Sequence, residues 1–467
     1  MESLNISDTN VLTDLKPIQR ESNKPSSHEK IIPINGEDPS FSIKQRDAFR
    51  LYKEGLNMFI TGPGGCGKTY LIKKIMDDAK SYSMNVALTA LTGCAAILLG
   101  PTATTLHSWG SIGLGDDDVE KYITTFQQKP FWAKNFLTTD LLIIDEISMA
   151  NPIYLDKLEQ IARVLRKSDK PFGGIQVILS GDFFQLPPVS KNRPTVYCFE
   201  HEIWDRVVEC EIELDFIFRQ KNIKFQEMLS HIRRGFLEKD DLKLLAGVHG
   251  KKPHTESGVI PTKIYSLTKR VMELNLTELN ILKTKVETFK LKESKTCNPG
   301  EITALRQLKN NGIFVEKLQL KIGAQVMCIA NINLEDGICN GSRGVVIDFQ
   351  SGFPVVKFVN DKELVMLPHV WEYKNSAKKI NVNITQIPLI LAWAVTIHKI
   401  QGATLDFAEI SIDGGIFECG QTYVALSRLT TLDGLYLRSF DANKIMANDR
   451  VIEFYKKFDK EVHIAER

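Results

Sequence analysis

The chain has 467 residues, of which 59 are Lys or Arg and 57 are Asp or Glu, so its net charge is only +2. Hydrophobic residues make up 43% of the chain and charged residues 25%. This composition is typical of a globular protein, and it excludes wholesale disorder, collagen-like and coiled-coil classes. Because the charge is balanced, any nucleic-acid partner must be held in a local groove and not by a basic tail.

The beginning of the chain differs from the rest in composition. Residues 1–40 contain 4 Lys or Arg, 7 Asp or Glu and few large apolar residues, which predicts a flexible tail. The opening MESLNISDTN has neither a basic nor an apolar segment of the kind found in secretory signals, and no later stretch reads as a membrane span. We therefore expect a soluble intracellular protein that has no membrane partner. A nucleus or a viral replication site is favoured, and a mitochondrion is compatible.

From Phe41 onward, apolar runs typical of strands alternate with helical periodicity. In chain order the first elements are the run LNMFITG, a helix with Leu71, Ile72, Ile75, Met76 and Ala79 on one face, the runs NVALTAL and LLIIDE, a helix through Leu155, Leu158 and Ile161, and IQVILSGD. A second such region starts near Phe216 and includes PTKIYSLT, IPLILAWAVTIHKIQG and AEISID. This alternation predicts an α/β protein with two doubly wound parallel sheets.

The same pattern predicts how the chain is divided. We expect one α/β unit over residues 41–215 and a second over residues 216–315 and 383–467. Between them, residues 316–382 contain short strands with turn signals, which predicts a small β-barrel insertion. The stretch from Lys221 to Lys309 holds 18 Lys and Arg against 10 Asp and Glu, but such an excess is more often a solvated helical face than a binding surface.

The segment GPGGCGKT, Gly62 to Thr69, fits the phosphate loop pattern G-x-x-x-x-G-K-[ST] between a strand and a helix. In such a loop the backbone N–H groups surround the phosphate oxygens. The residues that form or border it here are Gly62, Pro63, Gly64, Gly65, Cys66, Gly67, Lys68, Thr69 and Tyr70, and all of them except Pro63 have an N–H. In this pattern Lys68 places a positive charge beside the β- and γ-phosphates, and the hydroxyl of Thr69 binds Mg²⁺. The loop therefore predicts ATP and Mg²⁺ as ligands.

Two further strand ends narrow the chemistry. The run LLIIDE delivers Asp145 and Glu146 where open α/β sheets bind their ligands. Asp145 can hold Mg²⁺, while Glu146 can orient and deprotonate an attacking water, which predicts hydrolysis and not phosphoryl transfer to an acceptor. In GDFFQLPPV, Gln185 can touch both the γ-phosphate and the water. Phe183, Phe184 and Trp109 could stack on bases, yet each is more typical of a core.

Taken together these blocks resemble the Pif-one family of DNA helicases, in the RecD-like branch of superfamily 1B. The resemblance extends from about Phe41 to the C-terminus, and one departure is Leu91, where the family usually has Pro. The matching stretches are FSIKQRDAF, GPGGCGKT, TALTGCAA, TTLHSWGSIGLG, DEISM, FGGIQVILSGDFFQLPPV, FRQ, GAQVMCIANINLEDGICNGSRGVV, IPLILAWAVTIHKIQGATLD and GQTYVALSRLT.

The resemblance implies a fold and a set of further site residues. It implies two RecA-like motor domains with ATP between them, an SH3-like insertion, and a monomeric motor that moves 5′ to 3′ on single-stranded DNA and unwinds forked or tailed duplexes. By the same resemblance, Gln45 reads adenine, Arg219 and Arg428 stabilise the transition state, and Gln401 and Gly402 lie near the nucleotide. The implied DNA contacts are Thr92, His107, Ser108, Thr396, His398 and Lys399.

Three other functions stay open at this point. A related superfamily 1 RNA helicase would share some blocks, although TIHKIQGATLD favours the DNA branch. A DNA-stimulated translocase that does not unwind would need the same motor residues. An inactive nucleic-acid-binding scaffold is disfavoured, because every phosphate, metal, water and arginine group that hydrolysis needs is present.

Overall fold

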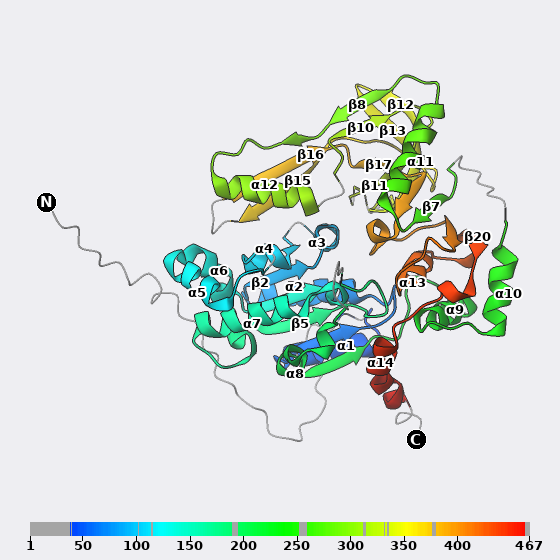
Figure 1. Ribbon diagram of the computed structural model, residues 1–467. Helices are drawn as coiled ribbons and strands as arrows, with labels where there is room; N and C mark the ends of the chain where they lie inside the picture. The colour runs from blue at the N-terminus through cyan, green and yellow to red at the C-terminus, as the bar shows by residue number, and fades with distance from the viewer. Residues whose placement is uncertain are drawn as a thin grey trace.

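The computed structural model describes residues 38, 40–100, 102–113, 115–188, 195–251, 259–311, 314–330, 332–333, 336–375 and 380–462. The tail predicted at residues 1–40 lies outside this part of the chain, apart from Asp38 and Ser40. The described residues form two parallel sheets with helices around them and a group of antiparallel strands, drawn at the top of Figure 1. The α/β class with two parallel sheets is confirmed.

The first parallel sheet has the strand order β3-β2-β4-β5-β1-β6. Strands β1 and β4 are buried along their whole length, as expected for continuous apolar runs in a sheet that helices cover on both faces. The carboxyl ends of all six strands meet at one edge. The strands are β1 (Met58–Thr61), β2 (Val86–Ala90), β3 (Thr104–Thr105), β4 (Leu141–Asp145), β5 (Gln176–Ser180) and β6 (Cys210–Glu213).

Amphipathic helices cover this sheet. In α2 the residues Leu71, Ile72, Ile75 and Ala79 are buried, as their spacing predicts, and Met76 is half-buried. Within the described residues, none of the helices has both the length and the apolar content to cross a bilayer. The helical segments here are α1 (Ile43–Lys53), α2 (Lys68–Ser81), α3 (Gly93–Leu99), α4 (Leu106–Gly110), α5 (Val119–Gln128), α6 (Pro130–Thr138), η1 (Ile147–Met149), α7 (Pro152–Arg166), η2 (Pro171–Gly174), η3 (Cys198–Glu200) and α8 (Glu202–Val207).

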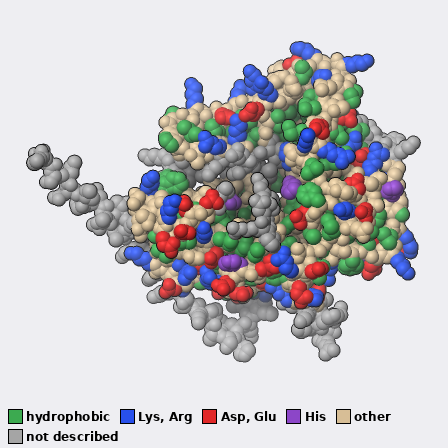
Figure 2. All heavy atoms as spheres, viewed as in Figure 1, with side chains coloured by type: hydrophobic (Ala, Val, Ile, Leu, Met, Phe, Trp, Pro, Cys, Tyr) green, Lys and Arg blue, Asp and Glu red, His purple; other side chains and the backbone are tan. Residues whose placement is uncertain are grey.

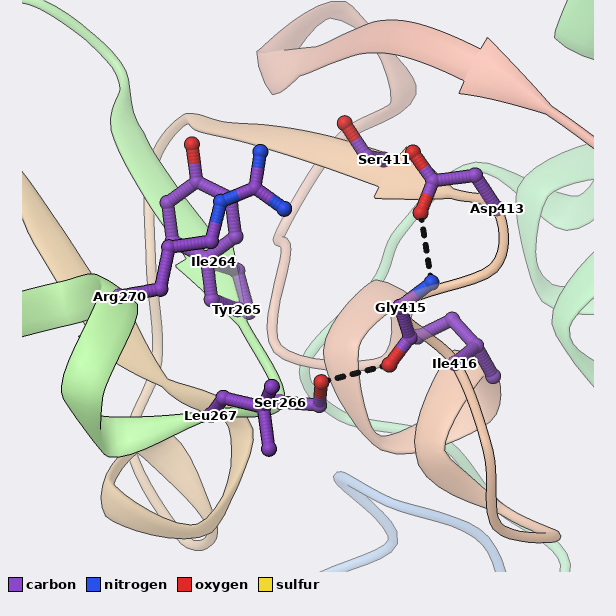
Figure 3. A pocket seen from close by; sticks show the side chains of 9 residues that line it. All are labelled: Ile264, Tyr265, Ser266, Leu267, Arg270, Ser411, Asp413, Gly415 and Ile416. Carbon is purple, nitrogen blue, oxygen red and sulfur yellow. Dashed lines mark hydrogen bonds between the residues drawn. The ribbon is translucent and has the colours of Figure 1, made fainter.

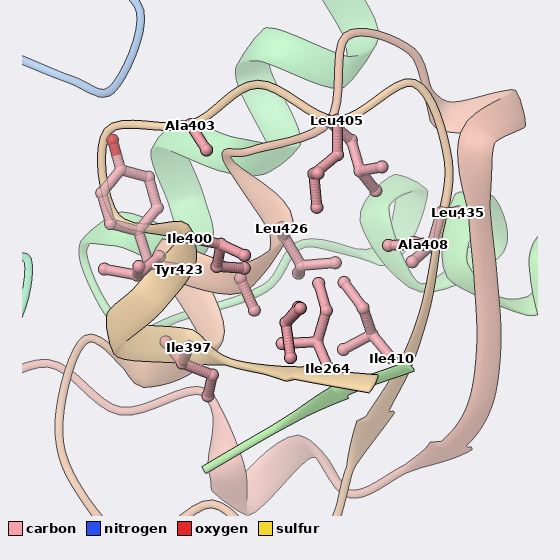
Figure 4. Packing of buried hydrophobic residues seen from close by; sticks show 14 of the residues in the cluster. Ile264, Ile397, Ile400, Ala403, Leu405, Ala408, Ile410, Tyr423, Leu426 and Leu435 are labelled. Atoms are coloured by element: carbon pink, nitrogen blue, oxygen red, sulfur yellow. The ribbon is translucent and has the colours of Figure 1, made fainter. Parts of the chain in front are cut away.

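The second parallel sheet has the order β18-β7-β19-β20. Ile264 of β7 and Ile410 of β19 pack with Leu426 of α13 in its core, together with Ile397 and Ile400 (Figure 4). This core fixes the segment between β18 and β19, which reaches the functional site. The elements are α9 (Ile223–Arg233), α10 (Lys239–Val248), β7 (Thr262–Tyr265), α11 (Thr268–Ile281), β18 (Ala394–Thr396), η4 (Ile397–Ile400), β19 (Ala408–Ile412), α13 (Gln421–Leu426), η5 (Leu432–Gly434), β20 (Leu435–Phe440) and η6 (Ala442–Lys444).

The antiparallel strands form three small sheets, of order β14-β13-β12-β11-β17, β10-β8 and β15-β16-β9. They lie within residues 287–391 and so extend on both sides of residues 316–382. In Figure 2, Lys and Arg side chains are frequent over this upper part of the molecule. The elements are β8 (Glu287–Lys290), β9 (Lys292–Glu293), α12 (Pro299–Asn311), β10 (Lys317–Leu320), β11 (Gln325–Cys328), β12 (Arg343–Gln350), β13 (Phe353–Phe358), β14 (Glu363–Val365), β15 (His369–Asn375), β16 (Ile380–Gln386) and β17 (Leu389–Leu391).

The last helix, α14 (Asp449–Val462), returns to the first sheet. Val451, Tyr455 and Phe458 are buried in the same cluster as Phe59 of β1. The hydroxyl of Tyr455 shares a 2.5 Å hydrogen bond with Oγ1 of Thr61, the last residue of β1. The end of the described chain therefore supports the strand from which the phosphate loop begins.

Candidate functional site

The phosphate loop connects β1 to α2. Gly62, Gly65 and Gly67 all have positive φ angles, which residues with a side chain rarely adopt. At Gly65 the space is also closed, because an added Cβ would lie 2.6 Å from the Cβ of Arg219. Gly67 is the N-cap of α2, so the loop leads directly to a helix N-terminus, where backbone N–H groups favour anions.

Lys68, the first residue of α2, folds back over this loop. Its Nζ donates to the carbonyl oxygens of Gly62 at 2.5 Å and Pro63 at 3.1 Å, and lies 3.6 Å from Sγ of Cys66. The ammonium group is therefore held above the loop, at the position where phosphate oxygens would meet it.

The two carboxylates lie at the carboxyl end of β4. Oδ1 of Asp145 accepts a 2.7 Å hydrogen bond from Oγ of Ser180, the last residue of the neighbouring β5. Glu146 has φ +57°, and its Oε2 accepts a 2.9 Å hydrogen bond from Nε2 of Gln401. Burial, together with the charge of Asp145, raises the pKa of Glu146, so this group is suited to accept a proton near neutral pH.

Gln185 follows β5 and is 6% exposed. Its backbone N–H donates to the carbonyl of Asp182 at 2.9 Å, which forms a tight turn beside the carboxylates. The aromatic residues nearby do not face solvent: Phe183, Phe184 and Trp109 are all buried. The prediction that these three are core residues is confirmed.

Two arginines approach the phosphate loop from outside the first sheet. Nη1 of Arg219 donates to the carbonyl of Ser427 at 2.9 Å, and Nη2 of Arg428 donates to the hydroxyl of the same serine at 2.9 Å. A Cβ placed on Gly64 would lie 3.0 Å from Nη2 of Arg428. Burial and, to a smaller extent, the charge of Arg428 lower the pKa of Arg219 to about 9. The site thus concentrates positive charge that an anion would offset.

Of the other expected nucleotide contacts, two border the cavity beside the phosphate loop and two do not line it. Gln401 and Gly402 border the same cavity as the phosphate loop. Gln45 is buried, its Oε1 accepts from the backbone of Ser42, and its Nε2 lies 3.4 Å from the carbonyl of Gly67. Tyr70 points elsewhere, because its hydroxyl donates to Asp38 at 2.6 Å.

These groups surround one cavity of about 550 Å³, a size within the usual range for small-ligand sites. It receives Lys68, Thr69, Asp145, Glu146 and Gln185 from the first sheet and its loops, and Arg219, Gln401, Gly402 and Arg428 from beyond it. Sequence reasoning missed several other lining residues. These are Ala95, Leu98, Leu99, Phe218, Cys339, Asn340, Thr404 and Thr430.

Of the missed residues, Cys339 and Asn340 come from the antiparallel part of the chain. The stretch GICNGSRG that contains them has the turn signals of the predicted β insertion, and nothing in its composition indicates a nucleotide. A second missed contact is the hydroxyl of Tyr423, which accepts a 2.7 Å hydrogen bond from the N–H of Gly64. Both depend on long-range packing that residue spacing does not report.

Comparison with known proteins places these features in a family. The PIF1-like helicase family model matches residues 41–242, and the model of the 2B domain of DNA helicase Pif1 matches residues 304–349. The chain is 38% identical over 427 residues to the ATP-dependent DNA helicase PIF1 of Danio rerio, covering 90% of this chain and 64% of that protein. It is 34% identical to the crystallised Pif1 helicase from Candida albicans, with a TM-score of 0.73, covering 90% of this chain and 99% of that one.

The chain belongs to the PIF1-like helicase family. A further structure, the Pif1 helicase from Bacteroides in complex with ADP-AlF3 and ssDNA, is 29% identical, with a TM-score of 0.62, and the match covers 91% of this chain and 98% of that one. The chain spans less than two thirds of the length of the Danio rerio relative.

The residues expected to contact DNA lie in two places at carboxyl ends of parallel strands. Thr92 follows β2 and caps α3, and His107 and Ser108 lie on α4, which follows β3. The ring of His107 is 4.5 Å from that of Tyr154, and burial lowers its pKa. Ser108 borders a separate polar cavity of about 390 Å³ beside β2. None of these side chains lines the nucleotide cavity.

The second group lies at the end of β18 in the second sheet. Thr396 is buried, and its Oγ1 accepts from the backbone N–H of Lys399 at 3.4 Å, capping η4. On η4, His398 is exposed and Lys399 is half-buried. These two side chains are therefore more accessible to a DNA strand than Thr396.

A small cavity of about 40 Å³ lies at the same edge, between the ends of β7 and β19. There Oγ of Ser266 donates to the carbonyl of Gly415, and the N–H of Gly415 donates to Asp413 (Figure 3). The guanidinium of Arg270 lies 4.4 Å from the ring centre of Tyr265. This volume has room for two or three waters and not for a nucleotide, so we interpret it as a packed turn.

Proposed function

We propose that this chain is an ATP-dependent DNA helicase that moves 5′ to 3′ on single-stranded DNA and separates forked or tailed duplexes. One observation carries the proposal: a single cavity joins the phosphate loop, Glu146 and Gln185 of one sheet to Arg219 and Arg428 from beyond it. Family membership supports the same activity, since the Danio rerio relative is named an ATP-dependent DNA helicase.

In the proposed hydrolysis, Glu146 is the general base that takes the proton of the attacking water. Its raised pKa, caused mainly by burial, matches this role, because a base is most effective when its pKa is near the working pH. Gln185 would orient the water, and Lys68, Arg219 and Arg428 would stabilise charge on the transferred phosphoryl group. Arginines of this kind contribute about 10³- to 10⁵-fold to the rate in related NTPases.

The donor set fits Mg²⁺ as the metal that accompanies ATP. The hydroxyl of Thr69 and the carboxylate of Asp145 border the same cavity, and oxygen donors of these two types are those that Mg²⁺ prefers. The bond from Ser180 orients the Asp145 carboxylate. When bound, Mg²⁺ would neutralise charge on the phosphate oxygens.

For the architecture, we propose two RecA-like motor domains, at residues 41–215 and at residues 216–315 with 383–467, and an SH3-like insertion at residues 316–382. Pairing of β8 with β10 indicates that residues before 316 also contribute to the insertion. ATP binding between the two parallel sheets would draw them together, and hydrolysis would release them.

Single-stranded DNA would then cross the carboxyl edges of both sheets. On the first it would meet Thr92, His107 and Ser108, and on the second the η4 residues His398 and Lys399 that follow Thr396. Contacts to the phosphate backbone would tolerate any sequence. The Bacteroides relative has been crystallised with ssDNA, which supports this ligand class. Because both groups of contacts lie on one chain, a monomer would be enough to bind the strand.

The test is ATP-dependent unwinding of two duplexes that differ only in a 5′ or a 3′ single-stranded tail. We expect opening of the 5′-tailed substrate alone. Opening of the 3′-tailed substrate alone would refute the proposed direction. ATPase activity without any unwinding would indicate a translocase, and stronger stimulation by single-stranded RNA than by DNA would indicate an RNA helicase.

A further inference from the structure

Arg343, the first residue of β12, has an environment that is unusual for a charged side chain. It is 1% exposed, and within the described residues its Nε, Nη1 and Nη2 make no hydrogen bond. The guanidinium instead lies 3.8 Å from the ring centre of Phe407 and 3.9 Å from Oδ2 of Asp406. Burying a charge without hydrogen bonds is unfavourable, so an apolar residue would stabilise this position better. Stability therefore does not explain the presence of an arginine at position 343, and we look for a different role.

The two contacts of Arg343 lie at one end of a functional segment. Residues 401–407 connect η4 to β19, and Asp406 and Phe407 end this connection. At its other end, Nε2 of Gln401 donates to Glu146 at 2.9 Å. The segment thus contacts the proposed general base, Glu146, at its first residue and contacts Arg343 at its last two residues.

The middle of the segment is hydrogen-bonded to the main chain around Arg428. The backbone N–H of Leu405 donates to the carbonyl of Arg428 at 3.0 Å, and the N–H of Thr430 donates to the carbonyl of Leu405 at 3.3 Å. A shift of residues 401–407 would therefore move the main chain of Arg428 as well as the amide of Gln401.

The turn that precedes Arg343 lies against the same segment. Cys339 and Asn340 of this turn border the nucleotide cavity together with Thr404. A Cβ on Gly341 would lie 3.0 Å from the carbonyl oxygen of Thr404, so the two backbones are in close contact. Arg343 thus lies at the junction where the antiparallel part meets the wall of the cavity.

We propose that Arg343 is a positioning residue for ATP hydrolysis. Through Phe407 and Asp406 it fixes segment 401–407 on the antiparallel part, and so holds Gln401 against Glu146 and keeps Arg428 in place. The guanidinium of Arg343 is attracted to the face of the Phe407 ring, and this contact gives the segment a defined position. The ion pair with Asp406 contributes less, because the side chain of Asp406 is largely exposed. The inference rests on the proposed function, because it assigns Arg343 to the same site.

The test compares Arg343→Met, Arg343→Lys and Lys357→Met in the full chain, with steady-state ATPase at saturating single-stranded DNA. Met fills the buried space without a charge, and we expect kcat to fall about 10- to 100-fold, as for small displacements of catalytic groups. KM for ATP should stay within about twofold, because the phosphate loop is untouched. Lys should restore most of kcat. Lys357 lies on β13, the strand that pairs with β12, and forms an ion pair with Asp361. Lys357→Met should therefore leave kcat unchanged.

A double-mutant cycle and hydrogen exchange complete the design. Arg343→Met should lower kcat less in the Gln401→Ala background than in the wild type, because part of its effect passes through Gln401. In Arg343→Met, the amide of Leu405 should exchange faster with solvent than in the wild type. Additive losses, unchanged exchange, or a loss of kcat accompanied by a lower melting temperature would each overturn the assignment. If the wild type hydrolyses no ATP, the proposed function fails, while exchange at Leu405 still decides whether Arg343 fixes the segment.

Discussion

The strongest test of the packing concerns Arg233, which joins α9 to the first sheet. Its Nη2 and Nε lie 2.9 and 3.1 Å from the two carboxylate oxygens of Asp182, and its Nη1 lies 2.9 Å from Oε1 of Glu213. The guanidinium is also 4.7 Å from the ring centre of Phe184 and 5.0 Å from that of Tyr455. One buried cation therefore connects the loop after β5, the edge strand β6 and the last helix.

Replacing Arg233 with Met keeps the side-chain volume but leaves the carboxylate of Asp182, which is 0% exposed, without its cation. Removing one partner of a buried ion pair costs about 3 to 5 kcal/mol. For a unit of 150 to 250 residues, about 1 kcal/mol corresponds to a shift of about 2 to 4 °C in melting temperature. We therefore expect Arg233→Met to melt about 6 to 20 °C below the wild type.

Arg234 provides the matched control, because it is the next residue and pairs with Asp459 at the surface. An exposed pair contributes about 0 to 1 kcal/mol, so Arg234→Met should lower the melting temperature by no more than about 4 °C. Combining Arg233→Met with Asp182→Asn should recover part of the loss, since the buried negative charge is gone. If Arg233→Met melted as high as Arg234→Met, the assignment of a stabilising buried ion pair would be refuted.

Three further predictions concern the site. Glu146→Gln should retain ATP binding, measured by equilibrium titration, but lose at least about 100-fold in kcat because it removes the general base; an unchanged kcat would exclude that role. Arg428→Ala should lower kcat by about 10³-fold or more with DNA bound, and a change confined to KM would contradict a contact that forms in the transition state. Lys399→Ala should weaken DNA binding equally for all sequences and reduce the slope of log affinity against log salt by about one, whereas an unchanged slope would mean that Lys399 does not meet a phosphate.

Much of the first sheet follows from local sequence. The run that forms β4 is apolar at four consecutive positions and ends in Asp145, so both the strand and the location of the carboxylate at its carboxyl end can be predicted. The face of α2 that includes Leu71 and Ile75 follows from helical spacing in the same way. These features depend on residues close in sequence, for which periodicity is a direct signal.

The features that could not be predicted depend on residues far apart in the chain. The hydroxyl of Tyr455 meets Thr61 across 394 positions, and nothing near either residue indicates the other. Asn340 reaches the nucleotide cavity only because the turn before β12 packs on Thr404. Pairing of β8 with β10 likewise draws residues 287–290 into the antiparallel part, although the predicted bounds place them in the second α/β unit.

The positive groups of the site are already hydrogen-bonded, and this determines what ATP must displace. Lys68 donates to the carbonyls of Gly62 and Pro63, and Arg219 donates to that of Ser427. Binding ATP would exchange these neutral acceptors for charged phosphate oxygens, so the number of hydrogen bonds need not change. The gain is then mainly Coulombic, about 4 kcal/mol for unit charges 4 Å apart at an effective dielectric constant of about 20. Since Lys68 and Arg219 come from the two sides of the cavity, a phosphate that attracts both would favour its closure.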